Sequence, residues 1–151
     1  MWRGAPYSGG YGATVTDREN LVTKIAAQGA RAGDIVVSLE DFFTGNDDRG
    51  SIGCNLGKDQ PPIPTFFQVL REIRSRPGVQ DVLVRVCEFD DPSSWPYSDT
   101  VYVLASAPID EVQQWLAPLK PDEVYAEWMY GPPPKAPALK PGVTPYSAWW
   151  D

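Results

Sequence analysis

The side chains best suited to chemistry are carboxylates, and they fall in two groups of the sequence. The first group comprises Glu40, Asp41, Asn46, Asp47 and Asp48, and the second comprises Glu88, Asp90 and Asp91. Carboxylate and amide oxygens are the ligands that Mg²⁺ and Ca²⁺ prefer, so the first group could bind a divalent cation. Its spacing does not fit an EF-hand loop, because Gly50 as the turn glycine would place Gly45 and Arg49 at ligand positions. A cation site here would therefore be irregular.

Both acidic groups also have a purely structural interpretation. Asn46, Asp47 and Gly50 are residue types that form turns and accept backbone hydrogen bonds in ordered loops. Asp90 and Asp91 precede Pro92, which is typical of a turn between two strands. The sequence leaves the chemical and the structural interpretations open.

The composition excludes several classes of catalytic mechanism. The chain has no histidine, which excludes Ser-His-Asp and Cys-His catalysis and every histidine-bound metal. Two cysteines, Cys54 and Cys87, fall short of the four ligands of a structural zinc site, and we expect both thiols to be reduced. No glycine-rich loop of the phosphate-binding kinds is present. We therefore predict no catalytic residues, no metal site and no cofactor.

The charge balance bears on the choice of partner. Twenty acidic residues against 13 basic ones give a formal net charge of −7, which opposes binding to nucleic acid and favours a basic protein. Trp95 and Tyr97 bring large aromatic areas, which anchor interfaces when they are exposed. The leading hypothesis is therefore a non-catalytic acidic protein-binding module that occludes a basic partner. The predicted partner-binding residues are Glu40, Asp41, Asn46, Asp47, Asp48, Asp90, Asp91, Trp95 and Tyr97.

The alternative hypothesis is a divalent-cation-binding protein or hydrolase that uses the Glu40–Asp48 carboxylates. The sequence predicts no membrane partner, because no apolar run approaches the roughly 18 to 20 residues that cross a bilayer. The beginning of the chain, MWRGAPYSGGYG, lacks the order of a secretory signal, and we therefore expect a cytoplasmic protein. No oligomeric state is predicted.

The pattern of apolar residues predicts a single α+β domain over residues 1–151. Helices are expected at 16–29, 66–76 and 108–117, and strands at 34–43, 79–89, 101–105 and 124–128. Thr16 and Glu19 have capping-box spacing, and Pro77-Gly78 ends the second helix. This gives the order α-β-α-β-β-α-β, with helices packed on a mixed or antiparallel four-stranded sheet.

Three segments are expected to lie outside this regular structure. Residues 1–14 are rich in glycine and aromatics without a period, and should form an irregular arm. Residues 44–65 are too long for a simple connection, which is typical of a functional loop. Residues 131–151 contain a proline-rich stretch that cannot pair in a sheet, so we expect an extended tail whose aromatic residues dock or dangle.

Two segments carry a resemblance to known proteins. VVSLEDFFTGNDDRGSIGCNL and WPYSDTVYVLASA resemble segments of an uncharacterised family of small cytosolic bacterial proteins, and this resemblance implies no activity. In general character, as a small acidic α+β domain, the chain is also similar to the immunity proteins that neutralise bacterial toxins. That similarity implies occlusion of a basic toxin surface as the mechanism.

Overall fold

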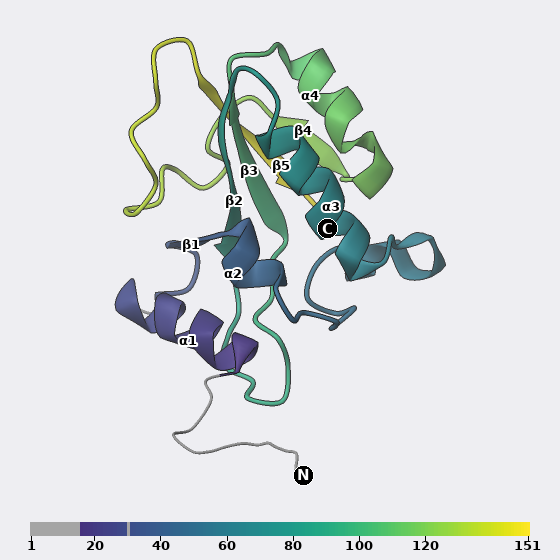
Figure 1. The fold of residues 1–151 in the computed structure, drawn as a ribbon, viewed down its shortest axis with the longest axis vertical. Helices are drawn as coiled ribbons and strands as arrows, with labels where there is room; N and C mark the ends of the chain where they lie inside the picture. The colour runs from purple at the N-terminus through teal and green to yellow at the C-terminus, as the bar shows by residue number, and fades with distance from the viewer. Residues whose placement is uncertain (1–15, 30) are drawn as a thin grey trace.

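A five-stranded antiparallel sheet organises the fold, with the strand order β1-β2-β3-β5-β4 (Figure 1). The computed structural model describes residues 16–29 and 31–151. The strands are β1 (Ile35–Ser38), β2 (Val79–Val86), β3 (Thr100–Ala105), β4 (Glu123–Tyr125) and β5 (Thr144–Trp149). The predicted irregular arm at 1–14 lies outside the described residues.

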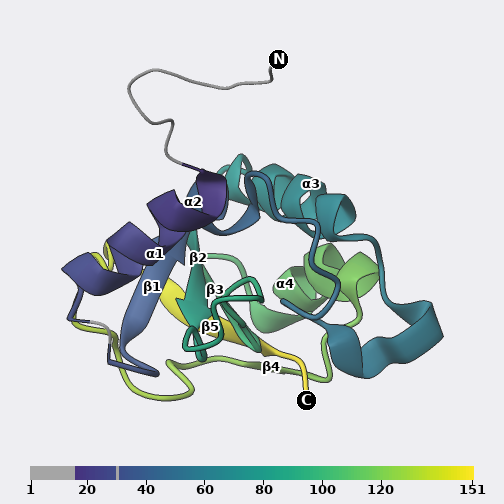
Figure 2. The ribbon, with the colours of Figure 1, turned by 90° about the horizontal axis from the view of Figure 1, so that it is seen from below.

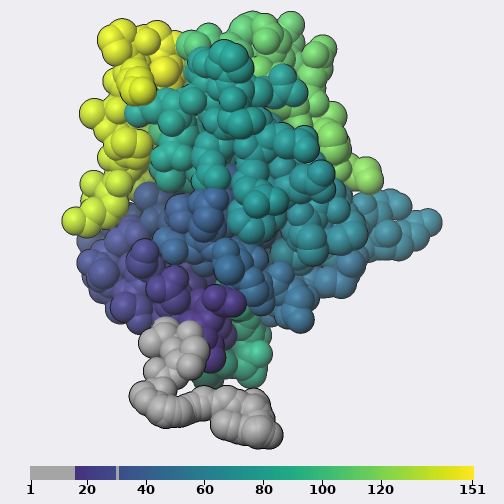
Figure 3. All heavy atoms as spheres, in the orientation of Figure 1, coloured from purple at the N-terminus to yellow at the C-terminus, as the bar shows by residue number. Residues whose placement is uncertain are grey.

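The helices cover one face of this sheet (Figure 2). They are α1 (Asp17–Ala27), α2 (Leu39–Phe43), α3 (Ile63–Arg74) and α4 (Ile109–Leu116), with the 3₁₀ turns η1 (Cys54–Asp59) and η2 (Ala117–Leu119). The chain between β4 and β5 passes over the opposite face, where Trp128 and Val143 pack against Tyr102 and Leu104. The α+β class and an antiparallel β2-β3 pair are thereby confirmed. In the space-filling view, η1 projects from the body of the domain (Figure 3).

The first helix begins where local capping chemistry predicts. Thr16 Oγ1 accepts a hydrogen bond from the Glu19 backbone N–H, and Glu19 Oε1 accepts one from the Thr16 backbone N–H. The helix buries Leu21 and Ile25 against the core, whereas Val22 lies at the surface. A reciprocal capping box needs only four consecutive residues, which is why sequence alone located it.

The side chain of Gln28 covers the open edge of β1. Its Nε2 donates to the Val36 carbonyl at 2.6 Å, and its Oε1 accepts from the Val36 backbone N–H at 3.2 Å. The glutamine amide thus makes the two bonds that a neighbouring strand would make. An edge strand left open is a site of unwanted pairing, and this contact closes it at its middle.

Replacing Gln28 by alanine is expected to lower the free energy of unfolding by about 1–2 kcal/mol, because the N–H and C=O of Val36, which are part-buried, lose their partners. Urea unfolding measures this loss, and hydrogen exchange at the Val36 amide should become faster. Gln68→Ala, at an exposed position of α3, is the matched control and should change stability by less than about 0.5 kcal/mol. Unchanged exchange at Val36 would contradict the role of Gln28.

The first strand is shorter than its apolar run predicts. We expected a strand over 34–43, but β1 ends at Ser38, and Leu39–Phe43 forms the helix α2. Ser38 Oγ accepts from the Asp41 backbone N–H at 3.0 Å and so caps the helix. A short apolar run fits a buried strand and a buried helical turn equally well, and a single serine cap does not decide between them without the packing of the turn.

The end of the chain is a strand and not an extended tail. Residues Thr144–Trp149 form β5 between β3 and β4, so the sheet has five strands where four were predicted. Tyr146 and Ala148 of β5, with Trp150 just beyond it, point into the helical core in period-two alternation. Pro145 lies near the start of the strand. Because proline is rare within a sheet, the sequence did not suggest a strand here. The proline-rich residues 131–142 lie outside the sheet, as expected.

Within the described part of the chain, no helix combines the length and the apolar character that crossing a membrane requires.

Candidate functional site

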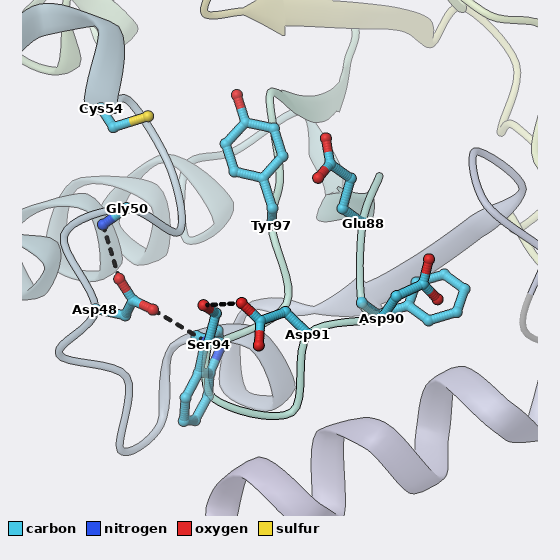
Figure 4. A pocket seen from close by; sticks show the side chains of 10 residues that line it. Asp48, Gly50, Cys54, Glu88, Asp90, Asp91, Ser94 and Tyr97 are labelled. Carbon is cyan, nitrogen blue, oxygen red and sulfur yellow. Dashed lines mark hydrogen bonds between the residues drawn. The ribbon is translucent and has the colours of Figure 1, made fainter.

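A cleft of about 450 Å³ opens between two loops on the same side of the domain. One is the long loop, residues 44–62, between α2 and α3, and the other is the hairpin loop, residues 87–99, between β2 and β3 (Figure 4). The cleft is lined by Asp48, Gly50, Cys54, Glu88, Phe89, Asp90, Asp91, Ser94, Trp95 and Tyr97. Four of these side chains are carboxylates, three are aromatic, and none is lysine or arginine.

Backbone pairing beyond the ends of β2 and β3 places two of the lining residues side by side. The Tyr97 backbone N–H donates to the Glu88 carbonyl at 2.7 Å, and the Cys87 N–H donates to the Tyr97 carbonyl at 2.8 Å. The ribbon therefore continues past the regular strands and carries a carboxylate beside a phenol at the cleft. Period-two alternation through 79–89 contains the signal for this continuation.

Asp48 holds the two loops together. Its Oδ1 accepts from the Gly50 backbone N–H at 2.8 Å, and its Oδ2 accepts from the Trp95 backbone N–H at 3.0 Å (Figure 4). Hydrogen bonds to a charged acceptor are the stronger kind, so this carboxylate is a structural link between loops that are distant in sequence. It stays at the wall of the cleft as a fixed negative charge.

Asp91 is also engaged within its own loop. Its carboxylate accepts from the Ser93 backbone N–H and hydroxyl and from the Ser94 hydroxyl. These hydrogen bonds stabilise the ionised form and lower the pKa of Asp91, with the side-chain bond to Ser93 as the largest cause. Asp91 is thus a turn residue that also contributes negative charge to the cleft.

The aromatic wall is fixed from behind. Trp95 Nε1 donates to the Phe42 carbonyl at 2.9 Å, which orients the indole ring. Arg18 of α1 donates to the carbonyls of Ser94 and Asp91 and holds the hairpin loop against the first helix. The wall is therefore organised before any ligand arrives.

Glu88 and Asp90 differ from the other two carboxylates. Both side chains are exposed, and neither has a hydrogen bond or ion pair with another of the described residues. They are the charges available to a ligand. Glu88 belongs to the second acidic group of the sequence but was not among the predicted partner-binding residues, since no local pattern distinguishes it from a solvated strand end.

The structure separates the predicted partner-binding residues into two sets. Asp48, Asp90, Asp91, Trp95 and Tyr97 line the cleft together, and Glu40, Asp41, Asn46 and Asp47 do not. Asn46 is buried, accepts from the Asp48 N–H at 3.0 Å and donates to Ser51 Oγ at 3.0 Å, so it orders the turn. Asp47 is exposed beside this turn.

Glu40 and Asp41 lie on α2 and contact basic residues of neighbouring helices. Glu40 makes a bidentate pair with Arg74, at 2.6 and 2.8 Å, and Asp41 pairs with Lys24 at 3.5 Å. Hydrogen bonding from Arg74 lowers the pKa of Glu40 to about 2. These two carboxylates therefore serve helix packing in the free protein.

The Glu40–Arg74 pair predicts a dependence of stability on pH. The folded-state pKa of Glu40 is about 2 and its ordinary value is 4.5, so the stabilisation is present above pH 4.5 and is lost as pH falls towards 2. Half of the Glu40 side chain is exposed, and solvent screening limits the effect to about 0.5–1 kcal/mol. Unfolding of the wild type and of Glu40→Gln, measured from pH 7 to pH 2, should differ at neutral pH and converge in acid.

Asp47→Asn, which removes an exposed carboxylate, is the control, and its difference from the wild type should stay small throughout. A difference between Glu40→Gln and the wild type that remained constant down to pH 2 would show that the pair does not carry the effect.

The cation-binding alternative receives no support from the arrangement of side chains. Across residues 16–29 and 31–151, no three His, Cys, Asp or Glu side chains are grouped so that they could hold a metal ion.

Comparison with known proteins identifies the family. Residues 16–148 match the family described as "Uncharacterized protein YfbO family". The chain is 38% identical over 117 residues to "Uncharacterized protein YfbO" of Escherichia coli (strain K12), a match that covers 77% of this chain and 82% of the relative. This chain belongs to that family. The resemblance to an uncharacterised bacterial family is thereby confirmed, and no solved structure matches the chain.

The two cysteines of this family member differ sharply in environment. Both are free thiols; Cys54 is exposed at the cleft and Cys87 is half-buried on the other face of the sheet. Burial, together with a 3.0 Å hydrogen bond to Asp99, raises the pKa of Cys87 to about 12. Cys87 is therefore held as an inert thiol.

Proposed function

We propose that this protein is a non-catalytic acidic binding module of the cytoplasm that covers a basic surface of a partner protein, as bacterial immunity and antitoxin proteins do. The observation that carries the proposal is the cleft, whose wall, among the residues that the structure describes, holds four carboxylates and no lysine or arginine. The net charge of −7 adds a long-range attraction for a basic partner and speeds encounter.

We expect the lining residues to contribute to binding in different ways. Glu88 and Asp90 present free carboxylates to a basic group of the partner. The Trp95 and Tyr97 rings supply apolar area that excludes water around that contact, which strengthens an ion pair. Asp48 keeps the two walls at a fixed separation, so little ordering is needed on binding.

The composition favours a binding role over catalysis. The sequence has no histidine to act as a base near neutral pH. Asp48 and Asp91 are engaged with backbone or hydroxyl donors, which leaves their oxygens poorly placed to accept a proton from a substrate. A binding role requires neither a histidine nor a carboxylate that accepts a proton.

Affinity capture from the producing organism tests the proposal. The immobilised wild type, the double variant Glu88→Lys/Asp90→Lys and the charge-matched control Glu72→Lys/Glu127→Lys are compared at low and high salt. Both control positions are exposed and lie outside the cleft lining. We expect a basic partner that the wild type and the control retain, that salt releases, and that the cleft variant loses by at least about tenfold.

Retention of the same basic partner by the cleft variant would overturn the proposal. If the protein is an immunity protein, the captured partner must also be harmful to cells when it is produced alone. Coexpression with the wild type should then restore growth, and coexpression with Glu88→Lys/Asp90→Lys should not.

A further inference from the structure

The chemistry of the cleft wall restricts which basic group it can accept. We infer that the group bound is the guanidinium of an arginine side chain carried by the partner protein, an inference that rests on the proposed function. The bound cation must be able to lie on aromatic faces and to reach carboxylates at the same time. The cleft lining contains both kinds of group, with Trp95 and Tyr97 half-buried and Glu88 and Asp90 exposed. Glu88 lies beside Tyr97, with which it pairs through the backbone (Figure 4).

A guanidinium suits such a wall better than an ammonium does. It is planar, weakly hydrated and able to stack on a ring while its edge donates to carboxylates. The ammonium of lysine is compact and strongly hydrated, and it loses more of its hydration against an aromatic surface. A metal ion would need converging oxygens, and the described residues group none.

The same preference is visible elsewhere in the domain. Three cation–π contacts occur among the described residues, and each uses arginine: Arg71 over Phe67 at 4.3 Å, Arg76 over Trp115 at 4.8 Å and Arg85 over Tyr130 at 3.7 Å. Arg85 also pairs with the Asp99 carboxylate at 3.4 Å, and so joins an aromatic face to a carboxylate in one side chain. The lining of the cleft contains the same two kinds of group, aromatic rings and carboxylates.

The cost of desolvating additional charges favours a protein-borne arginine over the free amino acid. Free arginine carries an α-carboxylate and an α-ammonium beside its guanidinium. The four carboxylates of the cleft repel the first and attract the second, and both charged groups lose hydration on entering the cleft. An arginine within a peptide has no such charge. The volume of about 450 Å³ lies within the range of sites that bury a whole ligand, so it leaves room for the backbone on either side of the arginine.

A peptide titration followed by NMR tests the inference with the full chain. The probes are acetyl-Gly-Arg-Gly-amide, its lysine and citrulline counterparts, free arginine, and n-propylguanidine, whose only charge is the guanidinium. We expect the arginine peptide to shift the Trp95 indole and the Glu88 and Asp90 amide resonances. It should bind about threefold or more tightly than the lysine peptide, with the citrulline peptide and free arginine much weaker.

Two double variants separate specific binding from general attraction. Glu88→Gln/Asp90→Asn should weaken the arginine peptide by about tenfold or more, because two charge-assisted contacts are lost. Glu72→Gln/Glu127→Gln, with the same change of net charge outside the cleft, should leave its affinity unchanged. The single variant Trp95→Leu should bring the arginine and lysine peptides to similar affinities, and its overall NMR spectrum shows whether the fold is kept.

The outcomes distinguish the inference from the proposed function. Equal affinities for the arginine and lysine peptides, shifts outside the cleft, or no peptide binding would overturn the inference, while partner capture that depends on Glu88 and Asp90 would still support the acidic module. Binding of n-propylguanidine more tightly than the arginine peptide would show that the cleft takes a small free guanidinium compound, which also overturns the inference. Capture that ignores both carboxylates would overturn the proposed function itself.

Discussion

Replacing Trp150 by alanine is expected to lower the free energy of unfolding by about 3–5 kcal/mol. Only 1% of this side chain is exposed, and its ring packs edge-on against Phe66 with centroids 5.7 Å apart. Its Nε1 donates to the Leu119 carbonyl at 2.9 Å. The substitution removes the largest fully buried side chain of the core and leaves a carbonyl without its donor.

Chemical denaturation of the wild type and the variant measures this loss. Trp149→Ala is the matched control, since the neighbouring tryptophan is only half-buried and should cost clearly less. Similar losses for the two substitutions would mean that Trp150 is not the core residue of the pair. The difference between the two losses also tests the alternation of faces along β5 and its continuation to Trp150.

Gly53→Ala is expected to have the second-largest effect, a loss of about 2–4 kcal/mol in the free energy of unfolding. Gly53 has φ +70° and ψ +16°, a left-handed conformation that costs any residue with a Cβ. A Cβ at this position would also lie 2.7 Å from Cζ of the buried Phe66 ring. The free-energy costs of the backbone strain and of the overpacking therefore add at this position.

Gly142→Ala separates these two contributions. Gly142 has a similar φ of +79°, but nothing lies within 4 Å of the position that its Cβ would take. It should therefore lose only the backbone part, about 1–2 kcal/mol. Equal losses of unfolding free energy for Gly53→Ala and Gly142→Ala would show that the Phe66 ring can move away from the added Cβ without an energetic cost. Because Gly53 precedes Cys54 at the cleft, Gly53→Ala should also weaken arginine-peptide binding.

Elements with local signals could be predicted from the sequence. The capping box at Thr16 and Glu19 sets the start of α1, and the 3.6-residue pattern from Phe66 onward identifies α3. The apolar run and the alternating run on either side of residues 90–99 predicted β2 and β3 as an antiparallel pair. In each case the information lies within a few residues, so no distant contact is needed to interpret it.

Elements that depend on a partner surface could not be predicted in this way. Residues 39–43 were assigned to a strand and form a helix, because only packing against α1 and α3 shows that a helical turn buries Leu39, Phe42 and Phe43. Residues 144–149 were assigned to a tail and form β5, because the backbone pairing offered by β3 and β4 overrides the nearby prolines. Both errors come from tertiary contacts.

The sequence by itself determined the chemical character of this protein: its acidity, its lack of histidine and the two groups of carboxylates. Only the tertiary structure decided which carboxylates act together. Asp48 meets the hairpin loop because its side chain bonds the Trp95 N–H, across 47 positions of the sequence. Arg74 pairs with Glu40, whereas the side chains of Glu88 and Asp90 have no partner within the described part of the chain. Residue type is a local property, but whether a charge has a partner depends on what folding brings within hydrogen-bond distance of it.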